Sequence, residues 1–296
     1  MDFTNLHLEH IQFLEIILFR SLGREVQVKD YFFLSGGCIN QAVQVATSAG
    51  AFFVKWNETT DEQFFACEVQ GLEALRQAGE IPVPEVIGYG RSEQRPYLIL
   101  ELLSFNQPKP DYWTRFGASL ARLHQHTQPE FGFRQNNFIG ALPQNNEPMV
   151  NGIEFFIERR LKPQAGLALY NQAMPQALYD QFQKLYARLP QILPDEKPAL
   201  LHGDLWHGNV ITGNDGYACL IDPAVHYGNR EAEIAFTHLF GDFDEDFYEA
   251  YGQAFPLQPG FEQRRDIYNL YPLLVHVNLF GSGYLSGVER IIKKFS

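Results

Sequence analysis

Cysteines are few in this sequence of 296 residues: there are three, Cys38, Cys67 and Cys219, and they are widely spaced. An odd number without regular spacing gives no disulfide framework. The sequence also has no Cys/His cluster of the kind that builds a structural zinc site. We therefore expect a protein of a reducing compartment, and the predicted localisation is cytoplasmic.

Long apolar segments and long basic runs are absent as well. No apolar stretch reaches the roughly 18 residues that a membrane-spanning helix needs. The first residues, Met1-Asp2-Phe3-Thr4-Asn5, include an acid and no basic region typical of a secretory signal. The formal net charge of -12 makes nucleic acid a poor partner. We expect binding neither to a membrane nor to nucleic acid, and the sequence does not determine an oligomeric state.

Hydrophobic residues make up 45% of the chain, which is enough for more than one ordinary domain. In the first hundred residues, apolar spacing and turn signals predict a helix over residues 5–21, three strands, a helix over residues 61–78 that Thr60 caps and Gly79 ends, and two further strands. The predicted strands cover residues 26–34, 41–47, 51–56, 86–90 and 97–102. Ser48-Ala49-Gly50 predicts a hairpin between the second and third strands.

After residue 111 the apolar residues follow helical spacing. Helices are predicted over residues 113–126, 153–169 and 174–189 and in the tail from residue 231, with a loop-rich stretch at 129–148 and a short strand-loop-strand at 200–221. The predicted fold is α+β and bilobal, with a small antiparallel-sheet N-terminal lobe and a mainly helical C-terminal lobe. We place the lobes at residues 1–103 and 104–296, with the boundary near Leu103-Ser104.

The segment 201–209 reads Leu-His-Gly-Asp-Leu-Trp-His-Gly-Asn and is the most specific pattern of the chain. Asp204 lies two residues after His202 and five before Asn209. This is the spacing of the catalytic loop in the protein-kinase fold, where the Asp accepts a hydroxyl proton and the Asn holds a metal ion. Asp204 is therefore the predicted catalytic base of an enzyme that transfers a phosphoryl group, and a turn-capping Asp is the simpler alternative.

A second acid stands thirteen residues after Asn209, where Leu220-Ile221-Asp222 ends an apolar strand. Asp222 and Asn209 supply hard oxygen donors of the kind that Mg²⁺ takes together with phosphate oxygens and water, so both are predicted metal ligands. Asn214-Asp215-Gly216 lies between them and predicts a hairpin that brings the two together, with Asp215 in the turn. Pro223 replaces the Phe that follows this Asp in protein kinases, so we do not expect phosphorylation of the kind that protein kinases carry out, and the sequence leaves open whether glycated proteins are accepted.

Lys55 and Glu68 are the predicted side-chain contacts around the nucleotide phosphates. Lys55 ends the apolar strand Phe52-Phe53-Val54, and a charge in that place needs a partner. Glu68 lies thirteen residues further on, in the next predicted helix, and could pair with Lys55 while the ammonium reaches the phosphates of ATP. A lysine that extends into solvent is the alternative.

Backbone groups at two further places are predicted to contact ATP. Gly36 and Gly37 lie in a turn at residues 35–40, where glycine permits close approach of N–H groups to phosphates. A plain glycine turn fits this segment equally well. The second place is the predicted adenine-binding hinge at the end of the last strand, formed by Glu101, Leu102 and Leu103.

Aromatic, histidine and cysteine side chains near these motifs offer further candidate contacts. Trp206, beside the base, is a tentative substrate contact that could stack on a sugar or amine, and a core tryptophan is the alternative. His202 is predicted to brace the catalytic loop by hydrogen bonds and is a second tentative substrate contact. His124 and His126 could ligate a metal, but a histidine-rich helix end explains them better. Cys38 is a candidate for redox sensitivity if its thiolate is stabilised.

Taken together, these segments resemble the fructosamine kinase (ketosamine-3-kinase) family, a branch of the aminoglycoside-phosphotransferase-like kinases, over nearly the whole chain. The most specific shared motif is His202-Gly203-Asp204-Leu205-Trp206 followed by Gly208-Asn209. Other shared landmarks lie at residues 35–40, 53–55, 82–85, 120–124, 136–140, 160–161, 163–164, 222–224 and 230–231. The resemblance implies a bilobal, protein-kinase-like fold.

The resemblance further implies an ATP-dependent kinase that phosphorylates the C3 hydroxyl of ketosamines such as fructoselysine. The product is unstable and sheds its sugar, so the implied activity is deglycation of amines. Asp204 matches the family's base, Asn209 and Asp222 its metal ligands, Lys55 its phosphate contact and residues 101–103 its nucleotide hinge. The implied cofactors are ATP and Mg²⁺, and the implied partner is a small-molecule ketosamine or glycated amine.

Three positions depart from the family pattern. Gly152 stands where the family often has Trp, Val275 where an Asn usually precedes His276, and Asn229 where many members have Asp or His. None belongs to the predicted phosphoryl-transfer set, so they bear on the identity of the acceptor. The alternative acceptors are an aminoglycoside, choline or a free sugar, and the alternative to an enzyme is an inactive, kinase-shaped binding protein.

Overall fold

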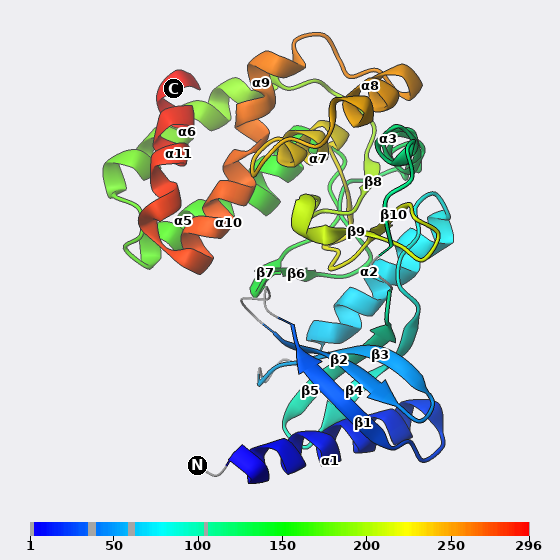
Figure 1. The fold of residues 1–296 in the computed structure, drawn as a ribbon. Helices are drawn as coiled ribbons and strands as arrows, with labels where there is room; N and C mark the ends of the chain where they lie inside the picture. Colours follow the sequence, from blue (N-terminus) through cyan, green and yellow to red (C-terminus); the bar gives the residue numbers. More distant parts are fainter. Residues whose placement is uncertain (1–2, 35–39, 59–62, 104–105, 296) are drawn as a thin grey trace.

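The computed structural model describes residues 3–34, 40–58, 63–103 and 106–295. The chain forms a small sheet with one helix against it at the N-terminal end, followed by a larger, mainly helical part that contains the C-terminus (Figure 1). The fold is α+β, as predicted. Gly36, Gly37, Cys38, Thr60 and Ser104 lie outside the described residues, so what the sequence predicts for them stays a prediction.

The five predicted strands form one antiparallel sheet in the order β1-β2-β3-β5-β4. Their bounds are Val28–Phe33 for β1, Gln41–Thr47 for β2, Gly50–Trp56 for β3, Val86–Ser92 for β4 and Arg95–Glu101 for β5. The predicted hairpin joins β2 and β3, and Thr47 pairs with Gly50 across it. Lys55 of β3 pairs with Leu98 of β5, which places Lys55 in the middle strand of the sheet.

Two helices, both predicted, cover the two faces of this sheet. α1 (Phe3–Leu22) shares a buried cluster with side chains of β2 and β3, and Ile99 of β5 belongs to the same cluster. α2 (Phe64–Ala78) shares another cluster with Leu98 and Leu100, which flank Ile99. This division follows from the alternation of side chains along a strand, which sends successive residues to opposite faces.

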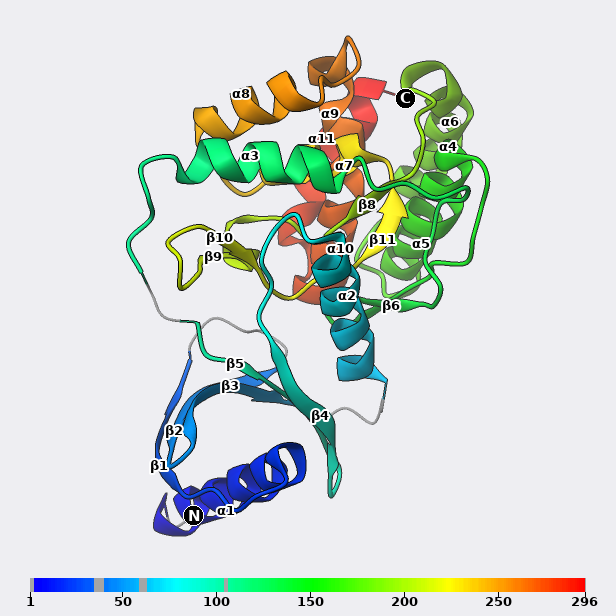
Figure 2. The same ribbon diagram turned by 90° about the vertical axis from the view of Figure 1, so that its right-hand side faces the viewer.

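α2 also reaches the helical part of the molecule (Figure 2). Phe65 near its start packs in the cluster on the sheet, whereas Leu75 near its end belongs to the large core cluster of the helical part. The helix ends at Gly79, which adopts a φ of 74° as its C-cap, a conformation that suits glycine. α2 therefore carries Glu68 at the junction of the two parts.

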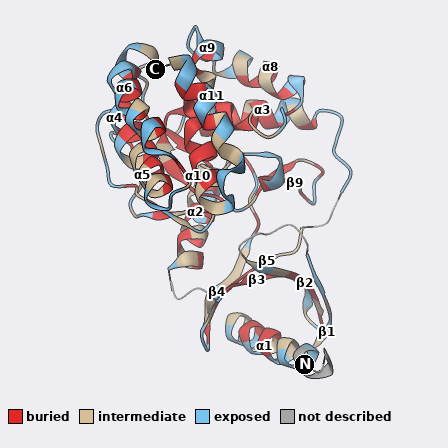
Figure 3. Cartoon of the chain, turned by 90° about the vertical axis from the view of Figure 1, so that its left-hand side faces the viewer, coloured by how far each residue is buried: buried red, intermediate tan, exposed pale blue. Residues whose placement is uncertain are grey.

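The larger part consists of helices around one core cluster and three short two-stranded ladders, and its buried residues line the inward sides of the helices (Figure 3). The helices are α3 (Tyr112–Leu123), α4 (Gly152–Phe155), α5 (Lys162–Tyr170), α6 (Gln176–Ile192), α7 (Arg230–Thr237), α8 (Glu245–Ala254), α9 (Phe261–Tyr268), α10 (Leu270–Phe280) and α11 (Leu285–Phe295). The ladders pair β6 (Asn137–Ile139) with β7 (Leu142–Gln144), β8 (Ala199–Leu201) with β11 (His226–Gly228), and β9 (Val210–Thr212) with β10 (Ala218–Leu220).

One helical region has a different form from the one predicted. The helix expected over residues 153–169 consists of α4, a π-helical turn at Phe156–Leu161, and α5. Pro163 has no N–H group, so the carbonyl of Arg159 cannot accept the usual α-helical bond from residue 163. The N–H of Lys162 bonds to the carbonyl of Ile157, five residues back, which is the spacing of a π-helix.

No helix within the described ranges combines the length and the apolar character that crossing a bilayer requires. We propose that the sheet with α1 and α2, and the helical part, correspond to the two predicted lobes, with residues 1–103 and 104–296 as their extents.

Gly117 offers a test of the packing of α3 on α8. A Cβ atom there would lie 2.1 Å from the backbone oxygen of Phe247 on α8, so Gly117→Ala forces the two helices apart. We expect this variant to lower the free energy of unfolding by about 1–3 kcal/mol. Gly166→Ala in α5 is the control, because a Cβ there meets nothing within 4 Å, and we expect a gain of about 0.5–1 kcal/mol. Chemical denaturation measures both effects, and full stability of Gly117→Ala would contradict the described packing.

Candidate active site

The predicted catalytic loop joins β8 to a 3₁₀ turn at His207–Asn209 and carries Asp204. The Asn209 amide donates a hydrogen bond to Oδ2 of the Asp204 carboxylate at 2.9 Å and another to the Asp204 carbonyl at 2.8 Å. Gly203 adopts a φ of 86°, and a Cβ there would lie 2.1 Å from the carbonyl oxygen of Ala224. Glycine at position 203 therefore lets the loop pack directly on the segment that follows Asp222.

His202 braces this loop from the inside, as predicted. Its side chain is buried, its Nε2 lies 2.9 Å from the carbonyl oxygen of Ile221, and its Nδ1 lies 3.3 Å from the backbone nitrogen of Asp204. Nε2–H donates and Nδ1 accepts in this arrangement, which requires a neutral ring. Burial lowers the pKa of His202 and favours that neutral form. These contacts assign His202 to the bracing of the loop, and its contact with a substrate stays a prediction.

Glu233 on α7, which the sequence analysis did not single out, holds the backbone of the same loop. It accepts hydrogen bonds from the N–H groups of His202 at 3.1 Å and Gly203 at 2.6 Å, and from Nε2 of His124 at 2.9 Å. Its side chain is only 1% exposed. Burial raises the pKa of Glu233, but the hydrogen bonds and the nearby histidines lower it overall, so the carboxylate stays ionised.

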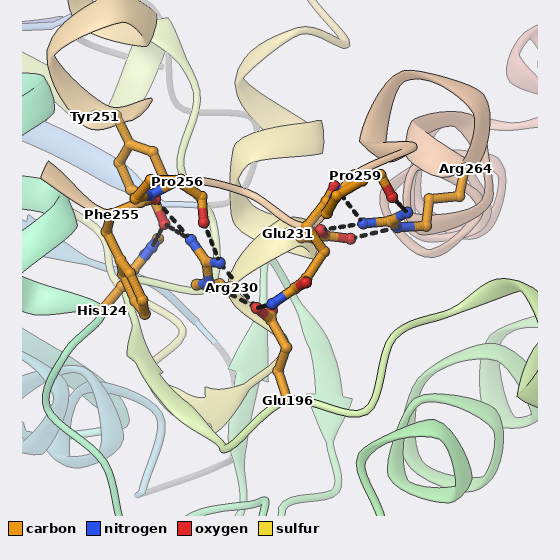
Figure 4. Close-up of polar contacts among 10 residues, drawn as sticks. His124, Glu196, Arg230, Glu231, Tyr251, Phe255, Pro256, Pro259 and Arg264 are labelled. Carbon is orange, nitrogen blue, oxygen red and sulfur yellow. Dashed lines mark hydrogen bonds and ion pairs between the residues drawn. The ribbon is translucent and has the colours of Figure 1, made fainter. Parts of the chain in front are cut away.

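The bracing continues from Glu233 through His124 to a set of polar contacts that Figure 4 shows. Nδ1 of His124 lies 2.8 Å from the Tyr251 hydroxyl, which accepts a hydrogen bond from Arg230 at 3.3 Å, and Arg230 pairs with Glu196 at 2.8 Å. Both ring nitrogens of His124 therefore have partners within this network. Among the described residues, no three His, Cys, Asp or Glu side chains gather so that they could hold a metal by themselves. The sequence gives no separate signal for Glu233, because the burial of the charged residues of α7 is known only from the structure.

Lys55 joins the N-terminal sheet to the catalytic segment. Its buried ammonium lies 2.6 Å from Glu68 on α2 and 2.5 Å from Asp222, just after β10. Burial alone would lower the pKa of Lys55, but the charges and hydrogen bonds of Asp222 and Glu68 raise it overall, so Lys55 stays protonated. Burial raises the pKa of Glu68 to about 7, against the opposing charge of Lys55. The predicted Lys55–Glu68 pair is confirmed, and Asp222 is a second partner.

Asn209 and Asp222 stand at the open end of the predicted hairpin, which β9 and β10 form. The N–H of Ile221 bonds to the carbonyl of Asn209 at 3.1 Å, so the two predicted metal ligands lie side by side, just outside the paired ends of β9 and β10. Asp215 is in the turn, where it accepts a hydrogen bond from the N–H of Tyr217 at 3.0 Å. Asp222 adopts a φ of 53°, which is uncommon for a residue with a side chain.

These two residues fit a magnesium ion that a nucleotide brings with it. The Asn209 amide nitrogen is turned to Asp204, which leaves the amide oxygen for a cation. The Asp222 carboxylate is 50% exposed although it touches Lys55. One carboxylate and one amide oxygen suit Mg²⁺, whose remaining ligands are usually phosphate oxygens and water.

Asp204 has the acid–base properties that a general base needs. Burial raises its pKa to about 7. The hydrogen bond from Asn209 lowers the pKa of Asp204, and the charges of Asp222 and Glu233 raise it further. A carboxylate that titrates near neutral pH can take up a proton during the reaction and release it afterwards.

Asp204 also lines a pocket in the helical part of the molecule. The space between its walls, including the portion open to solvent, is about 650 Å³. Of the three positions that depart from the family pattern, two line this pocket and the third contacts one of them. Asn229 and Val275 line the pocket, and the Asn229 amide donates to the carbonyl of Gly152 at 3.4 Å.

An aromatic cluster stands beside this pocket. Trp206 is 39% exposed, and its ring centroid lies 6.4 Å from that of Phe240. His276 lines the pocket, and its ring centroid lies 4.5 Å from that of Phe240 and 5.0 Å from that of Tyr284. Trp206 is therefore a surface aromatic residue near the pocket, and its contact with a substrate stays a prediction.

The predicted adenine hinge follows the last strand of the sheet. Glu101 is the final residue of β5, and Leu102 and Leu103 continue the chain without regular secondary structure. All three are partly exposed. Their binding to adenine stays a prediction, as does the phosphate contact of Gly36 and Gly37.

Comparison with known families and proteins gives a consistent result. The chain matches the family model described as fructosamine kinase over residues 12–296. A probable ketoamine kinase of Synechocystis sp. is 37% identical over 278 residues, which cover 93% of this chain and 93% of that protein. A chloroplastic protein-ribulosamine 3-kinase of Arabidopsis thaliana is 37% identical over 278 residues, which cover 92% of this chain and 84% of that protein.

Solved structures share the fold. The crystal structure of a candidate fructosamine-3-kinase from Haemophilus somnus has a TM-score of 0.87 and 28% identity, covering 95% of this chain and 96% of that chain. Aminoglycoside phosphotransferase APH(4)-Ia, in a ternary complex with AMP-PNP and hygromycin B, has a TM-score of 0.61 and 17% identity, covering 95% of this chain and 98% of that chain. At this low identity, the second likeness concerns the fold alone.

Glu233→Gln tests whether this carboxylate positions the catalytic loop. The amide places a donor against N–H groups, so we expect a loss of about 2–4 kcal/mol of unfolding free energy. We also expect kcat to fall by roughly 10–100-fold through a displaced loop. Glu231→Gln is the matched control. Glu231 lies on the same helix, but it pairs with Arg264, at a distance of 2.5 Å, and not with the loop. It should lose stability and keep kcat in the folded enzyme; equal loss of kcat in both variants would contradict the positioning role.

The pH dependence of stability tests the environment of Asp204. An unfolded Asp has a pKa of about 3.9, and that of Asp204 in the folded chain is about 7. The folded state therefore binds the extra proton, and the stability this provides is lost as the pH rises through about 7. Asp204→Asn removes this effect, so its melting temperature, without nucleotide or metal, should exceed that of wild type by more at pH 8 than at pH 5. A difference independent of pH would contradict the raised pKa.

Proposed function

The chain belongs to the fructosamine kinase family, and from this membership and the geometry of its site we propose that it transfers the γ-phosphoryl group of ATP to the C3 hydroxyl of a ketosamine. It is a kinase of the ketoamine kinase family. One observation supports the finer proposal above all. Asp204 lines the pocket for a small acceptor and at the same time contacts Asn209 and feels the charge of Asp222, the two residues suited to a nucleotide-bound metal.

Asp204 is the proposed base. Asn209 holds one oxygen of its carboxylate, so the other can accept a hydrogen bond from an acceptor hydroxyl in the pocket. The hydroxyl proton passes to Asp204 as the hydroxyl oxygen bonds to the γ-phosphorus. The bond between the γ-phosphorus and its bridging oxygen breaks, and ADP leaves with that electron pair. Positioning and charge stabilisation dominate in this class of reaction, so the fixed orientation of Asp204 is its main contribution.

Lys55 is the proposed contact of the nucleotide phosphates. Glu68 and Asp222 fix its ammonium from two sides, which holds a positive charge in place before the nucleotide arrives. Asn209 and Asp222 are the proposed ligands of Mg²⁺, which when bound neutralises charge on the phosphates. Residues 101–103 remain the proposed adenine hinge, and Gly36 and Gly37 remain proposed phosphate contacts. That APH(4)-Ia binds AMP-PNP on the same fold supports ATP as the donor.

The family implies a small ketoamine as the acceptor, and we propose a fructosamine such as fructoselysine. Relatives bear the names ketoamine kinase and ribulosamine kinase, so fructosamines and ribulosamines are the two acceptors to separate. Trp206, an exposed aromatic residue near the pocket, suits the face of a sugar or a protonated amine. If the 3-phosphate product sheds its sugar, the enzyme is a deglycating one.

A different alcohol is the second candidate acceptor, because three residues at or beside the acceptor pocket differ from the family pattern. Asn229 and Val275 line the pocket, and Gly152 contacts Asn229. APH(4)-Ia holds hygromycin B on the same fold. We also propose a cytoplasmic enzyme, because three widely spaced cysteines suit a reducing compartment. The Arabidopsis thaliana relative is chloroplastic.

An acceptor panel tests the proposal. The enzyme with ATP and Mg²⁺ is offered fructoselysine, a ribulosamine, an aminoglycoside, choline and fructose, and release of ADP is measured. We expect turnover of the ketosamines, with the phosphate found on C3 by NMR. Asp204→Asn should lower kcat by about 10²–10⁴ and still bind nucleotide in calorimetry, because Asp204 is not a proposed phosphate contact.

Two outcomes would contradict the proposal. Turnover of another alcohol without turnover of any ketosamine would overturn the acceptor. Equal inactivity of wild type and Asp204→Asn with every acceptor would favour a kinase-shaped binding protein.

A further inference from the structure

Arg160, Arg230 and Arg264 are the buried arginines in the described part of the chain. Arg230 pairs with Glu196 at 2.8 Å and Arg264 pairs with Glu231 at 2.5 Å (Figure 4). Arg160 differs, because none of the described Asp and Glu side chains forms an ion pair with it. A buried charge is expensive unless it is paired, so the missing anion calls for an explanation.

The neighbours of Arg160 are neutral acceptors and an aromatic ring. Nη1 donates to the carbonyls of Asn145 at 2.6 Å and Arg159 at 3.1 Å, and Nη2 donates to the side-chain oxygen of Asn146 at 2.7 Å. The Phe155 ring lies 4.6 Å from the guanidinium carbon. These bonds use three of the five N–H groups, and Nε has no hydrogen-bond partner within the described residues. Burial lowers the pKa of Arg160 to about 10, so it is charged at neutral pH.

Arg160 lines the same pocket as Asp204. Tyr271, which also lines the pocket, is close enough to feel both charges: burial raises its pKa, the charge of Arg160 lowers it and that of Asp204 raises it. The turn that carries Arg160 is the π-helical segment Phe156–Leu161, a feature frequent at functional sites. The acceptor pocket is therefore lined by the proposed base and by a buried cation that forms no ion pair with the described carboxylates.

We propose that Arg160 binds an oxyanion carried by the acceptor, so that the preferred ketosamines are negatively charged. This inference rests on the proposed function and narrows its acceptor class. The oxyanion has two possible sources: the carboxylate of a glycated free amino acid, or a phosphate group on the sugar. A guanidinium binds either through parallel N–H donors. A lysine that an unphosphorylated sugar has glycated within a protein offers neither group close to its sugar.

Three matched acceptors test this inference. The fructose adduct of glycine carries a carboxylate, the adduct of glycinamide is its neutral counterpart, and the 6-phosphate of the glycinamide adduct carries only a phosphate. We expect kcat/KM for one anionic acceptor to exceed that for the neutral adduct by about 10–100-fold, mainly through KM. The anionic acceptor that shows this preference identifies the source of the oxyanion.

Variants at two neighbouring arginines assign the effect. Arg160→Met should bring the anionic-to-neutral ratio of kcat/KM close to one, and Arg160→Lys should restore part of it. The ratio is taken within each variant, which cancels the fraction of folded enzyme. The ratios are then compared between variants, which cancels the difference in amine basicity between the acceptors. Arg159→Gln is the matched control, because it removes a positive charge from the same turn where Arg159 pairs with Glu147 at the surface. It should keep the wild-type ratio.

A wild-type ratio near one for both anions would overturn the inference, whether or not Arg160→Met folds. A ratio that persists in Arg160→Met would assign the anion to another residue and also overturn it. Turnover of none of the three ketosamines would overturn the proposed function, and this inference with it. Turnover by the wild-type enzyme without a preference for either anion would therefore overturn this inference alone and leave the proposed function in place.

Discussion

A charge removed from water needs a partner, and this constraint places the polar residues of the site. Lys55 meets it with one carboxylate from α2 and another from the end of β10, so a single ammonium ties the N-terminal sheet to a segment 167 residues further along the chain. Glu233 meets it by accepting N–H groups from the catalytic loop and from His124. In both cases the interaction that satisfies a buried charge also fixes a functional segment.

Pairing is incomplete where the chemistry is proposed. Asp204 is partly buried with an amide as its hydrogen-bonding partner, and burial together with two nearby carboxylates raises its pKa. Asp222 is half exposed although it touches Lys55, and Arg160 faces the acceptor pocket without a carboxylate. Groups that the protein leaves short of partners are the ones that substrates can satisfy. The contrast with the fully paired Arg230 and Arg264 supports a functional reason for the difference.

The sequence predicted features that depend on short-range spacing. The alternation of apolar residues gave the five strands of the sheet, and the local spacing of Asp204 and Asn209 gave the residues that the structure brings into contact. Glu233 and Arg160 were not predicted as site residues, although residues 160–161 belong to a segment shared with the family. A buried Glu or Arg has the same sequence appearance as an exposed one, and its contacts come from distant elements. The strands β6, β7 and β11 have three residues each, which is too short for an alternating pattern. The position of Pro163 is visible in the sequence, but the π-helical form of the turn before it, which carries Arg160, is not.

The central claim is that nucleotide and acceptor meet at Asp204, and a structure of the enzyme with AMP-PNP, Mg²⁺ and a ketosamine tests it most directly. The account predicts the acceptor's C3 hydroxyl within about 2.6–3.2 Å of the Asp204 carboxylate. It also predicts the γ-phosphate beyond that hydroxyl, beside Lys55 and the metal held by Asn209 and Asp222. An acceptor bound elsewhere, or with its C3 hydroxyl turned away from Asp204, would contradict it.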